Sequence, residues 1–169
     1  MLISSQGLPV PQGKAYAKRY RERVQEDLCG AIICLPSEVE GTKPTPIGVI
    51  HLAALQPRIA HNRHSQIGIN ILQAYQGKGY GSEAIEWIVE WGFRHANLHR
   101  VEIGAFAWNE GALRLYERLG FVIEGRKREA AWHDGQYMDV VEMSMLEREW
   151  RERQLTRKQS EADSVKEAI

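Results

Sequence analysis

The stretch that decides the fold is QGKGYGS, residues 76–82, which stands between a short apolar segment and the most regular helical pattern of the chain. Glycines occupy alternate positions here, and glycine lets a backbone approach a ligand closely and turn its N–H groups inward. The helix that follows would add a positive partial charge at its N-terminus, with Ser82 as its N-cap and Lys78 as a cation at the rim. This pattern predicts a pyrophosphate-binding loop.

Other glycine-rich loops bind phosphates with different spacings. The P-loop pattern GxxxxGK[ST] is absent, which argues against nucleotide hydrolysis. In the dinucleotide fingerprint GxGxxG, the third glycine would come one place later than Gly81 does. Glu102 nevertheless lies about twenty residues further on, where that fingerprint has its ribose-binding acid, so dinucleotide binding remains an alternative. A glycine-rich turn without a ligand is the remaining interpretation.

The segments around the loop predict a mixed fold. Short β-branched and alternating stretches predict strands, and Asp134-Gly135 predicts a hairpin near the end. Asn109 is a candidate N-cap, and Gly120 is the expected left-handed stop of the same helix. The predicted strands are residues 31–35, 47–55, 65–72, 100–107, 121–123, 130–132 and 137–146, and the predicted helices are residues 10–28, 82–96 and 109–119. The fold class is therefore α+β, a mixed α/β chain with a mostly antiparallel sheet.

Composition limits the kinds of function. The chain has 169 residues, and 22 Lys and Arg balance 22 Asp and Glu, so no overall charge favours nucleic acid or an anionic membrane. Two cysteines are too few for a disulfide framework, and no stretch is apolar enough to span a membrane. We expect a cytoplasmic protein with one domain over residues 1–150, whose core covers residues 29–146, and a charged tail over residues 151–169 that is frayed or disordered.

Two segments resemble a known family. The spacing Gln76-x-x-Gly79-x-Gly81 resembles motif A of the GNAT superfamily of N-acetyltransferases, which binds the pyrophosphate of acetyl-CoA. Residues 109–121, NEGALRLYERLGF, resemble the second signature of that family. Residues 124–146 are similar to the branch that holds ribosomal-protein-alanine and spermidine N-acetyltransferases. The resemblance covers residues 47–146 and implies a strongly twisted sheet flanked by helices, with a shortened N-terminal part.

The resemblance also implies roles for particular residues. The strand before the loop would pair its backbone with the pantetheine arm, as an added strand would. Tyr116 stands at the family's general-acid position, which protonates the leaving CoA thiolate; from the pattern alone it is a core aromatic residue on an apolar helix face. The implied cofactor-binding residues are Ile69, Asn70, Ile71, Gln76, Gly77, Lys78, Gly79, Tyr80, Gly81, Ser82 and Asn109. The cosubstrate is acetyl-CoA, and no metal is expected.

The proton acceptor departs from the family pattern. Gln66 stands where related enzymes often carry Glu, and a Gln side chain does not accept a proton at neutral pH. The alternatives are Glu102, His51 and His64, and we favour a water relay that ends at Glu102. The predicted catalytic residues are therefore Tyr116 and Glu102.

The acceptor amine is less determined. A peptide or protein N-terminal amine is the first expectation, and a polyamine or another small amine is the second. Trp132, Tyr137 and Asp139 on the final hairpin are the candidate substrate-binding residues, although cross-strand packing and an edge charge would explain them equally well. A homodimer is the candidate assembly. Two other functions remain open: a non-catalytic acyl-CoA-binding module and an NAD-binding oxidoreductase.

Overall fold

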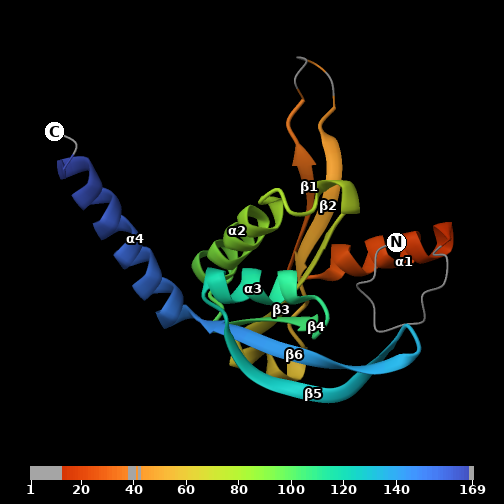
Figure 1. Cartoon of the computed structure of the whole chain (residues 1–169). Helices are drawn as coiled ribbons and strands as arrows, with labels where there is room; N and C mark the ends of the chain where they lie inside the picture. The colour runs from red at the N-terminus through yellow and green to blue at the C-terminus, as the bar shows by residue number, and fades with distance from the viewer. Residues whose placement is uncertain (1–12, 38–40, 42, 168–169) are drawn as a thin grey trace.

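Six strands form one sheet in the order β1-β2-β3-β4-β6-β5 in the computed structural model, which describes residues 13–37, 41 and 43–167 (Figure 1). All neighbouring strands are antiparallel except β3 and β4, which are parallel. The strands are β1 (Cys29–Leu35), β2 (Thr45–Leu52), β3 (His64–Ile71), β4 (Arg100–Phe106), β5 (Val122–His133) and β6 (Gln136–Leu146). The expected α+β class with a mostly antiparallel sheet is confirmed.

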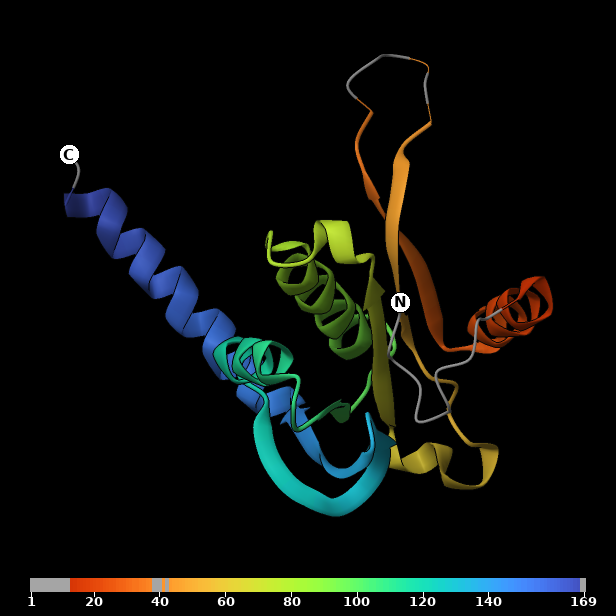
Figure 2. The same cartoon turned by 45° about the vertical axis from the view of Figure 1, so that its right-hand side comes forward.

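Helices cover both faces of this sheet. Helix α1 lies on one face, whereas α2 and α3 lie on the other (Figures 1 and 2). The helices are α1 (Lys14–Glu26), α2 (Tyr80–Arg94), α3 (Glu110–Leu119) and α4 (Glu147–Glu167), with short 3-10 turns at η1 (Pro57–Asn62) and η2 (Gln73–Tyr75). The predicted helix at residues 10–28 thus corresponds to α1, and residues 10–12 lie outside the described part.

The core lies between α2 and the sheet. Helix α2 repeats apolar residues every three or four positions, and this stripe is buried against alternate residues of the central strands. Val101 and Ile103 of β4 face α2, so the residues between and beside them face the α1 side. On β3 the same alternation places Gln66, Gly68 and Asn70 on the α1 side.

Strands β3 and β4 pair only at their N-terminal ends. His64–Gln66 of β3 align with Arg100–Glu102 of β4, and the pairing stops there. Residues Ile67–Ile71 pair with β2 along one edge only. Within the part of the chain that the structure describes, the other edge of this segment is therefore open, and the glycine loop follows directly at its end.

The C-terminal segment differs from the sequence expectation. Residues expected to be a disordered tail from 151 onward continue helix α4 as far as Glu167. The helix is anchored by Trp150, which is 7% exposed and whose ring centroid lies 5.6 Å from that of Phe93. Arg157 pairs with Glu86 of α2, which extends the contact by two further turns. One buried aromatic residue thus attaches a charged helix whose far end projects from the body (Figure 1).

None of the helices described within residues 13–167 combines the length and the apolar character that a bilayer span requires.

Candidate functional site

The glycine loop has a left-handed backbone at two positions. Gly77 has a φ of 71° and Gly79 a φ of 89°, and a Cβ at either position would meet nothing within 4 Å. Gly79 is the N-cap of α2, and no side chain caps the helix. The Ser82 N–H already donates to the carbonyl of Gly79 at 2.9 Å, so the N–H groups of Tyr80 and Gly81 are those of this first turn that remain available to an anion.

The expected N-cap at Ser82 is wrong. Helix α2 begins at Tyr80, so Ser82 lies within the first turn, and its Oγ accepts a hydrogen bond from Arg118 of α3 at 3.3 Å. The left-handed turn at Gly79 starts the helix three residues earlier than a cap at Ser82 would. The serine instead links α2 to α3.

Two side chains of the loop contact the protein itself. Gln76 Nε2 donates to the carbonyl of Ile71 at 2.8 Å, which ties the loop to the end of β3. Lys78 Nζ lies 5.6 Å from the ring centroid of Tyr75, a cation–π distance. These contacts fix the course of the loop. Its backbone then faces the open space beside Gly77 and Gly79.

Helix α3 lies beside the loop and has the predicted ends. Asn109 Oδ1 accepts from the backbone N–H of Ala112 at 3.2 Å, and Gly120 ends the helix with a φ of 99°. A Cβ on Gly81 would lie 3.5 Å from the side chain of Leu115, which places the apolar face of α3 against the loop. Both helix-end predictions are confirmed, and the two segments that resemble family signatures are neighbours.

Tyr116 lies in the core on the α2 side of the sheet. Its side chain is 6% exposed, and its ring centroid lies 6.2 Å from that of Phe121. Burial raises the pKa of Tyr116 to about 12, because the phenolate would lose its hydration. The hydroxyl is therefore protonated at neutral pH, as a general acid requires.

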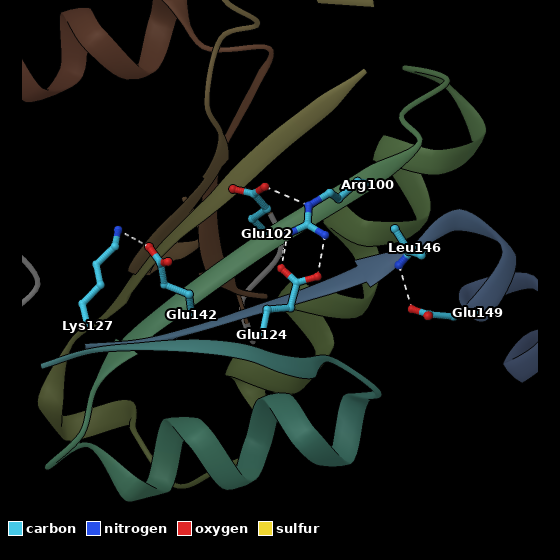
Figure 3. A network of polar contacts seen from close by, with 7 residues as sticks. All are labelled: Arg100, Glu102, Glu124, Lys127, Glu142, Leu146 and Glu149. Carbon is cyan, nitrogen blue, oxygen red and sulfur yellow. Dashed lines mark hydrogen bonds and ion pairs between the residues drawn. The ribbon is translucent and has the colours of Figure 1, made fainter. Parts of the chain in front are cut away.

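Glu102 lies on the opposite, α1 side of the sheet, beside Gln66 in the strand register. One of its carboxylate oxygens accepts from Arg100 Nε at 2.8 Å. Figure 3 shows that the same guanidinium also binds Glu124, with 2.6 Å between Nη1 and Oε1. The hydrogen bonds from Arg100 lower the pKa of Glu124 to about 2. Glu102 thus belongs to an ion cluster that joins β4 to β5, which sequence patterns do not reveal.

A second pair of ionisable groups lies on the same side of the sheet. His51 of β2 is 7% exposed, and its Nδ1 lies 2.6 Å from Asp27 Oδ2. Asp27 follows α1 and is 24 residues away in the sequence, so no local pattern predicts this contact. Its other oxygen accepts from the backbone N–H of Ala54 at 3.2 Å.

The candidate substrate residues lie on the β5–β6 hairpin. Trp132 and Tyr137 are directly opposed, with their rings edge to face at 4.8 Å, and they are 55% and 62% exposed. Asp139 accepts from the backbone N–H of Glu129 at 2.8 Å and pairs with Arg126. The hydrogen bond from Glu129, followed by the pairing with Arg126, lowers the pKa of Asp139.

A ring stack at the end of β4 was not expected from the sequence. Trp108 stacks with Phe106 and with His133 of β5, at centroid distances of 4.2 Å each. The hairpin thereby contacts the segment that leads into α3. Alternation along β4 ends at Ala107 in the sequence pattern, which gives no signal for this contact.

Comparisons with known proteins agree with this geometry. A putative ribosomal N-acetyltransferase of Bacillus subtilis, YdaF, is 36% identical over 89 residues, which cover 53% of this chain and 49% of the relative. A spermidine N(1)-acetyltransferase of Vibrio cholerae is 32% identical over 109 residues, 64% of this chain and 61% of the relative. The chain therefore matches about half to three fifths of the length of these curated relatives.

Solved structures resemble the whole fold. The spermidine N-acetyltransferase of Vibrio cholerae in complex with CoA and spermine has a TM-score of 0.69 and 25% identity, and the match covers 86% of this chain and 81% of that one. The family model of the Acetyltransferase (GNAT) family matches residues 6–121, more than half of the chain. Together with the adjacent glycine loop and α3 signature, this match establishes that the chain belongs to the GNAT acetyltransferase family.

Proposed function

We propose that the chain transfers the acetyl group of acetyl-CoA to a primary amine by direct attack. The observation that carries this proposal is the left-handed glycine loop, which leads from the open edge of β3 into an uncapped helix. The space in front of Gly77 and Gly79 is open where a Cβ would stand, so the backbone N–H groups there can approach a pyrophosphate closely. We assign the pyrophosphate to residues 76–82.

The open edge of β3 fits the pantetheine arm. Amide groups of the arm can pair with the backbone of Ile69, Asn70 and Ile71 as an added strand would. Successive N–H groups of a strand point to alternate edges, and because the Leu72 N–H donates to Ile47 of β2, those of Ile69 and Ile71 point to the open edge. One of these two can donate to the thioester oxygen as negative charge develops on it. Asn109, whose side chain caps α3 beside the loop, is the further residue we assign to the arm.

Two side chains would move protons in this reaction. The amine nitrogen forms a bond to the carbonyl carbon, the carbon–sulfur bond breaks, and the thiolate takes a proton from the Tyr116 hydroxyl. The amine must lose a proton to have a free lone pair, and Glu102 is proposed as the end of a water relay that carries this proton away. Tyr116 and Glu102 lie on opposite faces of the sheet. Tyr116 would therefore protonate the leaving sulfur from one face, and the relay to Glu102 would accept the proton of the amine nitrogen from the other.

A peptide or protein N-terminal amine is the proposed acceptor. A polyamine site needs free carboxylates, yet Glu102, Glu124, Asp139 and Glu142 on the strands are each paired with an arginine or lysine of the chain. The exposed Trp132 and Tyr137 pair offers an apolar contact of the kind a peptide uses. Spermidine remains the second candidate, because a relative and a solved structure are named for it.

We further propose a cytoplasmic location and a homodimer. Cys29 and Cys34 are free thiols, which suits a reducing compartment. Strand β5 forms an outer edge of the sheet, and its exposed Val122 and Ile123 are apolar positions that a second copy of the chain would cover. Light scattering in solution tests this assembly: a molar mass near the 19.3 kDa of one chain would contradict it.

The experiment that tests the function is a thermal-shift comparison with acetyl-CoA and with NAD, read together with thiol release. An alanyl peptide and spermidine serve as acceptors. A ligand at 100 times its Kd stabilises a protein by about 2.7 kcal/mol, which is readily measured. Stabilisation by acetyl-CoA with thiol release supports the proposal. Stabilisation without release favours a binding module, and stabilisation by NAD alone favours the oxidoreductase.

A further inference from the structure

The α1 side of the sheet holds an imidazole and a carboxylate in direct contact. The side chains of His51 and Asp27 are 9% and 8% exposed, and 2.6 Å separates Nδ1 from Oδ2. Asp27 Oδ1 is held by the backbone N–H of Ala54, so both carboxylate oxygens have fixed neighbours. The contact is a close charge contact whose angle is not that of a hydrogen bond, and the neighbouring carboxylate favours the proton on Nδ1 and leaves Nε2 with a lone pair.

The remaining nitrogen of His51 lies over β3. His51 is directly opposite Gly68 in the pairing of β2 with β3, and a Cβ on Gly68 would come within 2.1 Å of His51 Nε2. The imidazole thus occupies the place of a side chain on β3, and glycine is required there. Gly68 belongs to the segment Ile67–Ile71, whose other edge is open.

The surroundings of His51 favour the neutral ring. Burial, the largest influence, lowers the pKa of His51 below its ordinary 6.5, while Asp27 opposes this and Arg23 of α1 adds to it. The ring of Tyr20 of α1 meets the imidazole edge to face at a centroid distance of 6.2 Å. A neutral imidazole at pH 7 is the form that can accept a proton.

We propose that His51 takes the proton of the acceptor amine, directly or through one water, and that Asp27 is its positioning residue. This inference rests on the proposed acetyl transfer. The ammonium N–H bond breaks, the proton joins Nε2, and the imidazolium is stabilised by the Asp27 carboxylate until it releases the proton to the water relay that ends at Glu102. The amine keeps the electron pair with which it attacks the thioester.

The position of His51 agrees with the rest of the proposed site. One strand spacing of about 4.8 Å separates neighbouring backbones, so a group that lies over β3 is within reach of a ligand along the open edge of that strand. Tyr116 lies on the other side of the sheet, where it would serve the leaving sulfur. Gln66, two residues before Gly68, stands beside Glu102, so a water relay toward Glu102 begins on the same face.

The test compares His51→Gln, Asp27→Asn, Glu102→Gln and His99→Gln, using acetyl-CoA with an alanyl peptide over pH 5 to 9. Glutamine can still donate an amide N–H to Asp27 but has no basic nitrogen, which protects the fold while removing the proton acceptor. Asparagine at position 27 would keep its oxygen toward Ala54 and turn its NH₂ toward the ring, which favours the wrong tautomer. His99→Gln is the matched control, because His99 is an exposed histidine.

We expect His51→Gln to reduce kcat at pH 7 by about 10²-fold or more, with the acetyl-CoA KM and the thermal shift with acetyl-CoA unchanged. Wild-type kcat should reach half of its maximum at a pH below the ordinary histidine pKa of 6.5, whereas that of His51→Gln should keep rising to pH 9. Asp27→Asn should have a lower kcat than the wild type without an increase in the acetyl-CoA KM.

Different results would separate the two proposals. A folded His51→Gln enzyme with wild-type kcat and an unchanged pH profile would overturn the role of His51 and leave the acetyl transfer standing. Loss of activity in Glu102→Gln with full activity in His51→Gln would assign the proton to Glu102 alone. Absence of thiol release by the wild-type chain with the alanyl peptide and with spermidine would refute the transferase and the role of His51 together.

Discussion

Replacing Gly79 by alanine tests the glycine loop at its most demanding position. Its φ of 89° lies in the left-handed region, and a new Cβ would meet nothing within 4 Å, so backbone strain is the whole cost. That strain is about 1–2 kcal/mol for an L-residue. Gly81 provides the matched control, because its new Cβ would make ordinary contacts at 3.5 and 3.6 Å. Alanine there gains up to about 1 kcal/mol of helix propensity.

The two variants should therefore differ by about 2 kcal/mol in the free energy of unfolding, which corresponds to roughly 4–8 °C in Tm for a chain of this size. Differential scanning calorimetry without ligand measures this difference. Repeated with acetyl-CoA, the scan should show a smaller ligand shift for Gly79→Ala than for Gly81→Ala. A Gly79→Ala protein as stable as Gly81→Ala would refute the left-handed geometry. Ligand shifts that equal the wild-type shift in both variants would refute the pyrophosphate assignment.

Three further outcomes follow from the contacts described above. Tyr116→Phe should reduce kcat by about 10²-fold. The pKa of Tyr116 is about 12 in the folded protein and about 10 in the unfolded chain, so the wild type should lose up to about 3 kcal/mol of stability as pH rises from 10 to 12. The variant should not show this loss. Arg100→Gln should cost about 1 kcal/mol at pH 7, since Glu124 is 40% exposed and partly screened. The pKa of Glu124 is lowered from 4.5 to about 2, so this contribution is present above pH 4.5 and the difference between wild type and variant should shrink as pH falls toward 2 in acid-unfolding curves. Trp150→Ala should lower the unfolding free energy by about 3 kcal/mol and reduce the helical circular dichroism signal, because it removes the buried anchor of α4; an unchanged signal would mean that the helix does not depend on this contact.

The sequence predicts those features that depend on local chemistry. The side-chain cap at Asn109, the left-handed stop at Gly120 and the Asp134-Gly135 turn all appear as expected, because each is decided by a few consecutive residues. The glycine loop also lies where its spacing places it. The start of helix α2 differs from the expectation. Gly79, with its positive φ, is the N-cap in place of Ser82, and Ser82 binds Arg118.

Features that depend on distant pairings escape such patterns. The contact of His51 with Asp27 and the contact of Arg100 with Glu124 join different elements, and no periodicity relates the partners. The charge-rich tail over residues 151–169 is expected to be frayed or disordered, because Leu155 is the one large apolar residue among its first ten positions. The buried ring of Trp150 and the contacts of Arg153 and Arg157 with other helices attach α4 to the body, and pairs such as Arg151 with Glu147 support the helix locally.

The short pairing between β3 and β4 divides the sheet into two halves that come from different segments of the chain. Residues 29–71 supply β1, β2 and β3, which pair as chain neighbours. Residues 100–146 supply β4, β5 and β6, of which β5 and β6 form a hairpin and β6 also pairs with β4. Among the described residues, the halves are joined by backbone pairing at His64–Gln66 and by hydrogen bonds from the His99 and Arg100 N–H groups to the Arg63 carbonyl, all at one end of the junction. Local hairpins close quickly and distant contacts slowly, so folding should end with the docking of two preformed half-sheets. A ligand bound along the open edge of β3 would then connect the two half-sheets. Amide hydrogen exchange should therefore slow in both half-sheets when the ligand binds.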